Sequence, residues 1–115
     1  MKLSDLATRL EAVEARVPQP TVQSTVIVPV ETFAPEPYRL LRPFHVVVQP
    51  YHDEYVATYF DANIGATGDT QEEAVANLKD VILSLYEHLR ALSDAQLGPE
   101  PRRQRRILQS LIKKA

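Results

Sequence analysis

GDTQEEAVANLKD, residues 68–80 of the 115-residue chain, contains the strongest local structural signal in the sequence. Thr70 and Glu73 fit a capping box, in which the threonine hydroxyl accepts from the Glu73 amide and the glutamate carboxylate reaches back to the helix start. Apolar residues then recur at the spacing of one helix face; they are Ala74, Val75, Leu78, Val81, Ile82, Leu85, Leu89 and Leu92. This pattern predicts a long helix that begins after Thr70 and packs one face on a sheet.

Two runs rich in β-branched and aromatic residues precede this helix. Residues 44–49, FHVVVQ, and 55–60, YVATYF, are separated by a polar link of hairpin length. Residues 63–67 form a weaker third run, and Gly68 with Asp69 makes the turn into the helix. The three runs predict an antiparallel sheet on which the helix packs.

The segments before these strands are rich in β-branched residues and proline. Residues 21–31, TVQSTVIVPVE, predict a further strand, and Pro29 places its end at an edge or a bulge because proline cannot donate to a ladder. Residues 32–43 combine several prolines with apolar residues. We therefore expect an ordered but irregular connection there, lying against the core without regular pairing.

The N-terminal segment contains a short apolar repeat. Its members follow the alternating spacing of three and four that is typical of a coiled-coil seam; they are Leu3, Leu6, Leu10, Val13 and Val17. A helix of about 15 residues is marginal alone in water, so it must pack either on its own domain or on a second copy. Pro18 and Pro20 form a stiff break that favours self-association, and we predict a homo-oligomer.

The C-terminal segment is basic, whereas the rest of the chain is acidic. Residues 1–98 carry a net charge of −7, and residues 99–115 carry +5. After Gly98 the sequence predicts a second helix, from Pro101 or Arg102 to Lys113. Its apolar side holds Ile107, Leu108, Leu111 and Ile112.

The basic residues of this segment have two interpretations. In the first, the helix docks on the body through its apolar side and its arginines pair with the acidic surface. In the second, the cations contact nucleic-acid phosphates. The residues concerned are Arg102, Arg103, Arg105 and Arg106, together with Lys113 and Lys114.

Together these patterns predict one small α+β domain with appended segments. The expected architecture is a three- or four-stranded antiparallel sheet with one long helix packed on it, an N-terminal oligomerising helix and a short basic C-terminal helix. The boundaries fall at 1–20 for the first helix and its linker, 21–92 for the α+β domain, and 93–115 for the tail. The chain has no cysteine and no apolar run approaching the roughly 20 residues of a membrane span, so we expect a cytoplasmic protein that makes no membrane contact.

Residue types used in catalysis and metal binding are scattered along the chain. The histidines are His45, His52 and His88, and none has a second histidine four residues on or a ligand cluster nearby. No serine lies in a G-x-S-x-G turn, and no lysine accompanies a glycine-rich phosphate loop. We expect no enzymatic activity, no metal and no cofactor.

Residues 55–57, YVA, taken with residues 68–80, resemble the HicB-like antitoxin family. The matching positions run through strand, turn and helix; they are Tyr55, Val56, Ala57, Gly68, Asp69, Thr70, Glu72, Glu73, Ala74, Asn77 and Leu78. The resemblance implies a small antiparallel sheet with one helix across it, and a non-catalytic protein that binds and masks a small RNA-cleaving toxin. Residues 97–104, LGPEPRRQ, are similar to the tail of stand-alone members that have no DNA-binding domain.

The expected partner-binding residues are His52, Asp53 and Glu54, in the link between the two main strands. Acidic charge there would steer a small basic toxin, which could add along the edge of the hairpin formed by residues 44–60. Alternatively, residues 21–31 close that edge. Two further functions stay open, namely nucleic-acid binding by the basic tail and a purely self-assembling structural role.

Overall fold

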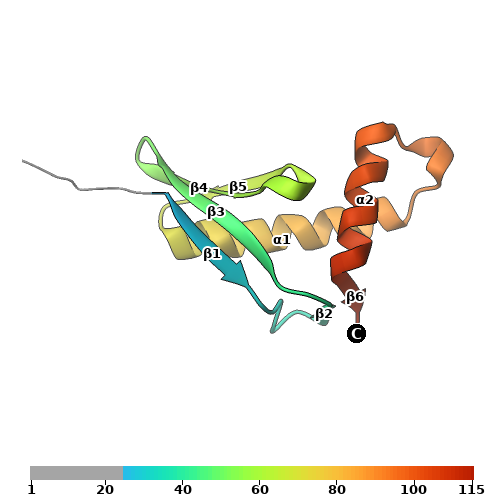
Figure 1. Ribbon diagram of the computed structural model, residues 1–115, viewed down its shortest axis with the longest axis horizontal. Coiled ribbons are helices and arrows are strands. Elements are labelled where there is room, and N and C mark those ends of the chain that lie inside the picture. The colour runs from blue at the N-terminus through green and yellow to red at the C-terminus, as the bar shows by residue number, and fades with distance from the viewer. Residues whose placement is uncertain (1–24) are drawn as a thin grey trace, which may run out of the picture.

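The structure, a computed structural model, describes residues 25–115. The predicted oligomerising helix, with Leu3, Leu6, Leu10, Val13 and Val17, lies outside the described residues. The elements in chain order are β1 (Val26–Val30), β2 (Tyr38–Leu40), β3 (Phe44–Tyr51), β4 (Glu54–Tyr59), the 3₁₀ helix η1 (Phe60–Ala62), β5 (Ile64–Gly68), α1 (Gln71–Arg90), the 3₁₀ helix η2 (Asp94–Gln96), α2 (Pro99–Leu111) and β6 (Ile112–Lys114). They form an α+β fold in which α1 packs on a four-stranded antiparallel sheet (Figure 1), as the sequence predicts.

The four-stranded sheet has the order β1-β3-β4-β5, and each neighbouring pair is antiparallel. Ile27 of β1 lies opposite Val47, and Val48 on the next position of β3 lies opposite Ala57 of β4. β1 is therefore an edge strand and occupies the side of β3 that β4 does not. Pro29 lies in β1, where a missing amide hydrogen is tolerated because one side of the strand has no ladder partner.

The turn between β3 and β4 is tighter than the sequence predicts. β3 continues to Tyr51, and only His52 and Asp53 connect it to β4. His52 has a φ of 55°, the left-handed conformation used in two-residue hairpin turns. Such turns match the twist of the strands, so the pairing extends to Tyr51 opposite Glu54.

The helix α1 begins at the predicted capping box. The Thr70 hydroxyl oxygen accepts a hydrogen bond of 3.0 Å from the Glu73 amide. The Glu73 carboxylate accepts at 2.7 Å from the amide of Asp69, one residue before the donor that the motif predicts. Gly68 is required beside this cap, because a Cβ atom there would lie 2.4 Å from the backbone nitrogen of Ala74.

The hydrophobic core lies between α1 and the sheet face that it covers. Every second residue of a strand and every third or fourth residue of the helix point into the core, because side chains repeat with these periods in the two elements. Its fully buried members from these elements are Val46, Val48, Ala57, Ala74, Leu78 and Ile82. The opposite side of the sheet receives the remaining strand positions.

The helix α2 differs from its prediction at both ends. It begins at Pro99, because a proline suits the first helical turn, where the amides have no carbonyl partner. It ends at Leu111 and not at Lys113. Both Leu111 and Ile112 are buried, and the extended conformation of Ile112 lets these adjacent side chains enter the core together.

The residues after α2 form a strand that the sequence analysis did not predict. β6 pairs antiparallel with β2 in a separate two-stranded sheet, with Leu40 opposite Ile112. β2 lies within residues 32–43, so the prediction that this segment makes no regular pairing was wrong over three residues. The partner strand lies more than 70 positions away, and such pairing has no local signal.

The tail packs at one end of the domain. α2 crosses the C-terminal end of α1, and the hairpin turn between β3 and β4 lies at the opposite end of the molecule (Figure 1). α2 also contacts η1. Within residues 25–115 no helix has the length and apolar character needed to cross a membrane.

Candidate protein-binding surface

The side of the four-stranded sheet that faces away from α1, here called the outer face, carries apolar side chains. Strand alternation places Ile27, Val47, Tyr51 and Val56 on it, because their neighbours Val46, Val48 and Ala57 point into the core. Cross-strand register aligns Ile27 with Val47 across β1 and β3. Neither of the two described α-helices packs on this face.

Three large apolar side chains on this side are well exposed. Ile27 is 65% exposed and Tyr51 is 60% exposed. Phe60, which follows β4 and lines one hollow together with Val47, is 62% exposed. Val47 and Val56 between them are partly exposed. Several exposed apolar side chains on one sheet face favour a binding interface.

The predicted partner-binding residues lie at one end of the outer face. His52, Asp53 and Glu54 are all exposed. Glu54 lies opposite Tyr51 in the β3–β4 register, so the two side chains share the outer face. The rings of Tyr51 and His52 meet edge to face, with centroids 4.4 Å apart. Tyr51 was not among the predicted partner-binding residues. The signal for it is the alternation of Tyr51 with the buried residues of β3, which places Tyr51 on the outer face.

The prediction that residues 44–60 offer a free strand edge was wrong. β3 pairs with β1 on one side and β4 on the other, and β4 pairs with β3 and β5. The alternative, in which residues 21–31 close the edge, is confirmed for the described strand β1. The two edges of the sheet are β1 and β5. The β5 edge is partly closed, because the Asn77 amide donates a 2.8 Å hydrogen bond to the Thr67 carbonyl. The outer face and its hairpin end carry the exposed apolar and acidic side chains that a partner could contact.

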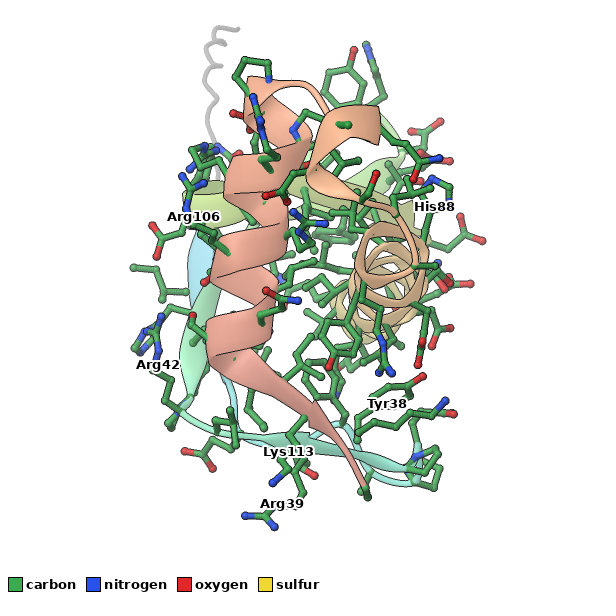
Figure 2. All side chains as sticks on the ribbon, turned by 90° about the vertical axis from the view of Figure 1, so that its right-hand side faces the viewer. Tyr38, Arg39, Arg42, His88, Arg106 and Lys113 are labelled. Atoms are coloured by element: carbon green, nitrogen blue, oxygen red, sulfur yellow. The ribbon has the colours of Figure 1, made fainter. Side chains whose placement is uncertain are left out.

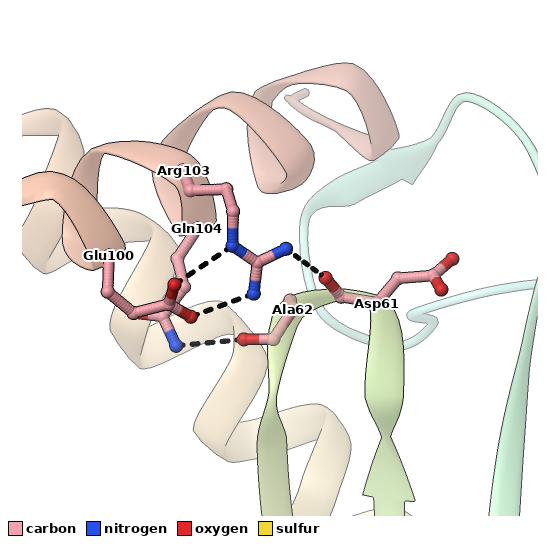
Figure 3. Close-up of polar contacts among 5 residues, drawn as sticks. All are labelled: Asp61, Ala62, Glu100, Arg103 and Gln104. Atoms are coloured by element: carbon pink, nitrogen blue, oxygen red, sulfur yellow. Dashed lines mark hydrogen bonds and ion pairs between the residues drawn. The ribbon is translucent and has the colours of Figure 1, made fainter.

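Two of the four tail arginines are engaged in the fold. Arg103 donates two hydrogen bonds to Glu100, at 2.9 and 2.8 Å, and one of 2.7 Å to the Asp61 carbonyl (Figure 3). Arg105 binds the Leu92 carbonyl at 2.7 Å and the carboxylate of Asp94. The hydrogen bonds from Arg103 hold the pKa of Glu100 below its ordinary value. The structure shows the docking of the apolar side of the tail, because Leu108, Leu111 and Ile112 are buried. The predicted pairing of the arginines with the acidic surface of the body is not seen within residues 25–115, because both carboxylate partners, Glu100 and Asp94, belong to the tail itself.

A polar cluster fastens β2 and β6 to α1. The Tyr38 hydroxyl donates a hydrogen bond to Glu87, and the Lys114 amine lies 3.4 Å from the same carboxylate. The hydrogen bond from Tyr38, followed by the contact with Lys114, lowers the pKa of Glu87, and the pKa of Tyr38 is raised in return. Each of the three residues has a partner in the fold, so this cluster is structural.

The residues considered for metal or acid-base chemistry do not form a site in the described part of the chain. His45, His52 and His88 are exposed on β3, the hairpin turn and α1. Among residues 25–115, no three histidine, aspartate or glutamate side chains lie close enough to hold a metal ion.

Comparison of the chain with protein-family models, with curated proteins and with solved structures gave no match. The resemblance of residues 55–57 and 68–80 to HicB-like antitoxins stays a prediction.

Proposed function

We propose that this chain is a non-catalytic protein-binding module of the HicB-like antitoxin type, which holds a small basic RNA-cleaving toxin on its outer face. The observation that carries the proposal is the exposed apolar surface of that face, with Ile27, Tyr51 and Phe60 each more than half exposed. Large apolar side chains at the centre of a patch with a polar rim are the usual anchors of protein interfaces.

The charge at the hairpin end supports a basic partner. Asp53 and Glu54 are exposed beside Tyr51, and no ion pair neutralises them within the described residues. A protein that cleaves RNA needs cations for the phosphates of its substrate. Carboxylates that cover those cations accelerate association and keep RNA away from them.

The test is co-expression of the full chain with the small basic protein encoded beside its gene, scored by cell growth, by co-purification and by RNA cleavage in the purified complex. Wild type restores growth, and Ile27→Lys removes this protection because it places a charge on the apolar surface. Val81→Lys is the matched control, since Val81 is an exposed apolar residue of α1, away from the outer face. Protection by both variants, or by neither, contradicts the proposal.

A second pair of variants tests the acidic end. Asp53→Lys with Glu54→Lys slows association with the basic protein, most strongly at low salt, while Asp80→Lys on the exposed side of α1 leaves it unchanged. The proposal is overturned if no small basic partner is found and Ile27→Lys converts an oligomer of the chain into a monomer. The outer face is then a self-assembly surface.

A further inference from the structure

Two cations lie directly opposite each other in the β2–β6 sheet. Arg39 is the register partner of Lys113, and both side chains are exposed. Like charges in this position repel, so the arrangement weakens the strand pair. Lys114, the next residue of β6, has its charge balanced by Glu87 at 3.4 Å. No acidic group of residues 25–115 pairs with Arg39 or Lys113.

Two further cations extend this charge along the same end of the molecule. Figure 2 places Arg106 and Arg42 one after the other on the side of α2 away from His88, with Arg39 and Lys113 beyond them. Arg42 donates to the neutral hydroxyl of Ser110 at 3.2 Å. Neither Arg42 nor Arg106 forms an ion pair within the described residues. We call Arg39, Arg42, Arg106 and Lys113 the basic surface.

The basic surface contrasts with three other arginines of the same end. Arg90, Arg103 and Arg105 each have a carboxylate partner from the fold. The four cations of the basic surface do not, although two of them repel each other across a strand pair. These cations are therefore available to a polyanion outside residues 25–115.

A hollow next to Arg42 adds a feature that a nucleobase fits. Its volume is about 240 Å³, and its lining includes Arg42, Tyr59 and the exposed Phe60. An aromatic ring beside an arginine is the combination with which proteins hold a base and its phosphate.

We propose that the basic surface binds the phosphate backbone of a single-stranded nucleic acid, with one base stacked on Phe60 in the hollow beside Arg42. The sequence predicts Arg103 and Arg105 among the residues that contact phosphates. They are not part of the basic surface, because they are engaged in docking the tail. The proposed nucleic-acid binding does not rest on the proposed toxin binding, because the four cations take no part in that proposal. Phe60 belongs to both surfaces, whereas Asp53 and Glu54 lie at the opposite end of the molecule. Asp61 also lines the hollow and opposes a phosphate there.

The test is fluorescence anisotropy of a labelled single-stranded RNA of about 12 nucleotides and mixed sequence, titrated with the full chain at several salt concentrations. Each phosphate contact to a single strand contributes a slope of about −0.7 in log affinity against log salt, so four contacts give about −3. Arg39→Gln with Lys113→Gln lowers the affinity and reduces the slope by about 1.4. Lys79→Gln removes a cation of α1 that lies outside the basic surface, and it leaves the affinity and the salt slope unchanged.

Three further variants report on the hollow. Asp61→Asn tightens binding, because it removes a negative charge beside the phosphate, and an unfolded variant cannot mimic this gain. Phe60→Leu weakens binding about tenfold through loss of stacking, whereas Phe60→Tyr retains it. Thermal unfolding followed by circular dichroism verifies that each variant is folded.

The proposal is overturned if the RNA does not bind at the lowest salt concentration, or if Lys79→Gln weakens binding as much as the Arg39 and Lys113 pair of changes. If polyglutamate of equal charge binds as tightly as the RNA, the partner of the basic surface is an acidic protein and not a nucleic acid. If a duplex of the same sequence binds more tightly than the single strand, and Phe60→Leu does not change the affinity, no base stacks on Phe60. Loss of toxin protection in Ile27→Lys with RNA binding intact shows that toxin binding and RNA binding fail independently.

Discussion

The guanidinium of Arg103 donates a 2.7 Å hydrogen bond to the main-chain carbonyl of Asp61, a residue 42 positions earlier in the chain. Figure 3 shows the Asp61 carboxylate turned away, so the contact uses the backbone and leaves that charge at the surface. The neighbouring Gln104 donates in the same way to the Ala62 carbonyl, at 2.8 Å. α2 is thereby attached to the turn after β4, and the basic tail is part of the domain.

Removal of the Arg103 contact is expected to destabilise the protein. Arg103→Gln loses the hydrogen bonds to Glu100 and to the Asp61 carbonyl, and we expect a lower free energy of unfolding. Arg102→Gln is the control, because the side chain of Arg102 has no polar partner within residues 25–115. Urea unfolding of both variants measures the difference. Equal effects would mean that the tail docks through its apolar residues alone.

Gly68 and Gly65 make a matched pair in the same strand. A Cβ atom at Gly68 would lie 2.4 Å from the Ala74 nitrogen, which is backbone and cannot move aside cheaply. At Gly65 the nearest atom would be 3.5 Å away, an ordinary contact. Gly68→Ala is expected to cost about 2 kcal/mol or more, and Gly65→Ala much less. Denaturant midpoints check this, and a mild effect at Gly68 would contradict the packing of α1 on β5.

The cap of α1 is tested by two substitutions at one position. Thr70→Ala removes the acceptor for the Glu73 amide and is expected to lower the free energy of unfolding by about 1 kcal/mol. Thr70→Ser retains a hydroxyl and is expected to keep most of this stability. Amide hydrogen exchange of the first helical turn should increase in the alanine variant only.

The cluster at Glu87 predicts a dependence of stability on pH. Its pKa is lowered in the folded protein by the Tyr38 hydrogen bond and by Lys114, so the carboxylate form is favoured by folding. The resulting stability is present above the unfolded pKa and is lost as the pH falls through the folded pKa. Urea unfolding between about pH 7 and pH 3 should show a shallower acid loss in Glu87→Gln than in wild type. Glu72→Gln on the exposed start of α1 should not change the curve in this way.

Tyr38 adds the opposite dependence at high pH. The Glu87 hydrogen bond raises the pKa of the Tyr38 hydroxyl, so the protonated form is favoured by folding. Its stability is present below the unfolded pKa and is lost as the pH rises through the folded pKa. Tyr38→Phe should remove this alkaline loss. An unchanged alkaline curve would contradict the hydrogen bond.

Repulsion between Arg39 and Lys113 predicts that a substitution stabilises the protein. Arg39→Gln removes one of two like charges in register, and we expect the free energy of unfolding to rise by about 0.2–1 kcal/mol at low salt. Arg106→Gln, a cation with no cross-strand partner, should leave it unchanged. A decrease in Arg39→Gln would mean that the pair is balanced by a group of the same chain, and the polyanion argument would lose its basis.

Local chemistry was sufficient to predict the parts of the fold whose interactions are close in sequence. The Thr70 and Glu73 cap joins residues three positions apart, and the hairpin between β3 and β4 closes over two residues. The cap and the existence of the hairpin follow from side-chain type and spacing, whereas the turn is shorter than the polar link that the sequence predicts. Asp53 lies in the turn as expected, and Glu54 is the first residue of β4.

The surfaces proposed for binding depend on contacts between distant residues, which local patterns do not contain. Arg103 became a structural residue only because α2 reaches Asp61, and Arg39 meets Lys113 only because β6 pairs with β2. Such contacts are formed when the core closes, since burial of Leu111 and Ile112 brings the tail against the body. Residue spacing therefore identified strands, helices and charged segments, while packing decided which charges are neutralised inside the fold and which stay available to a partner.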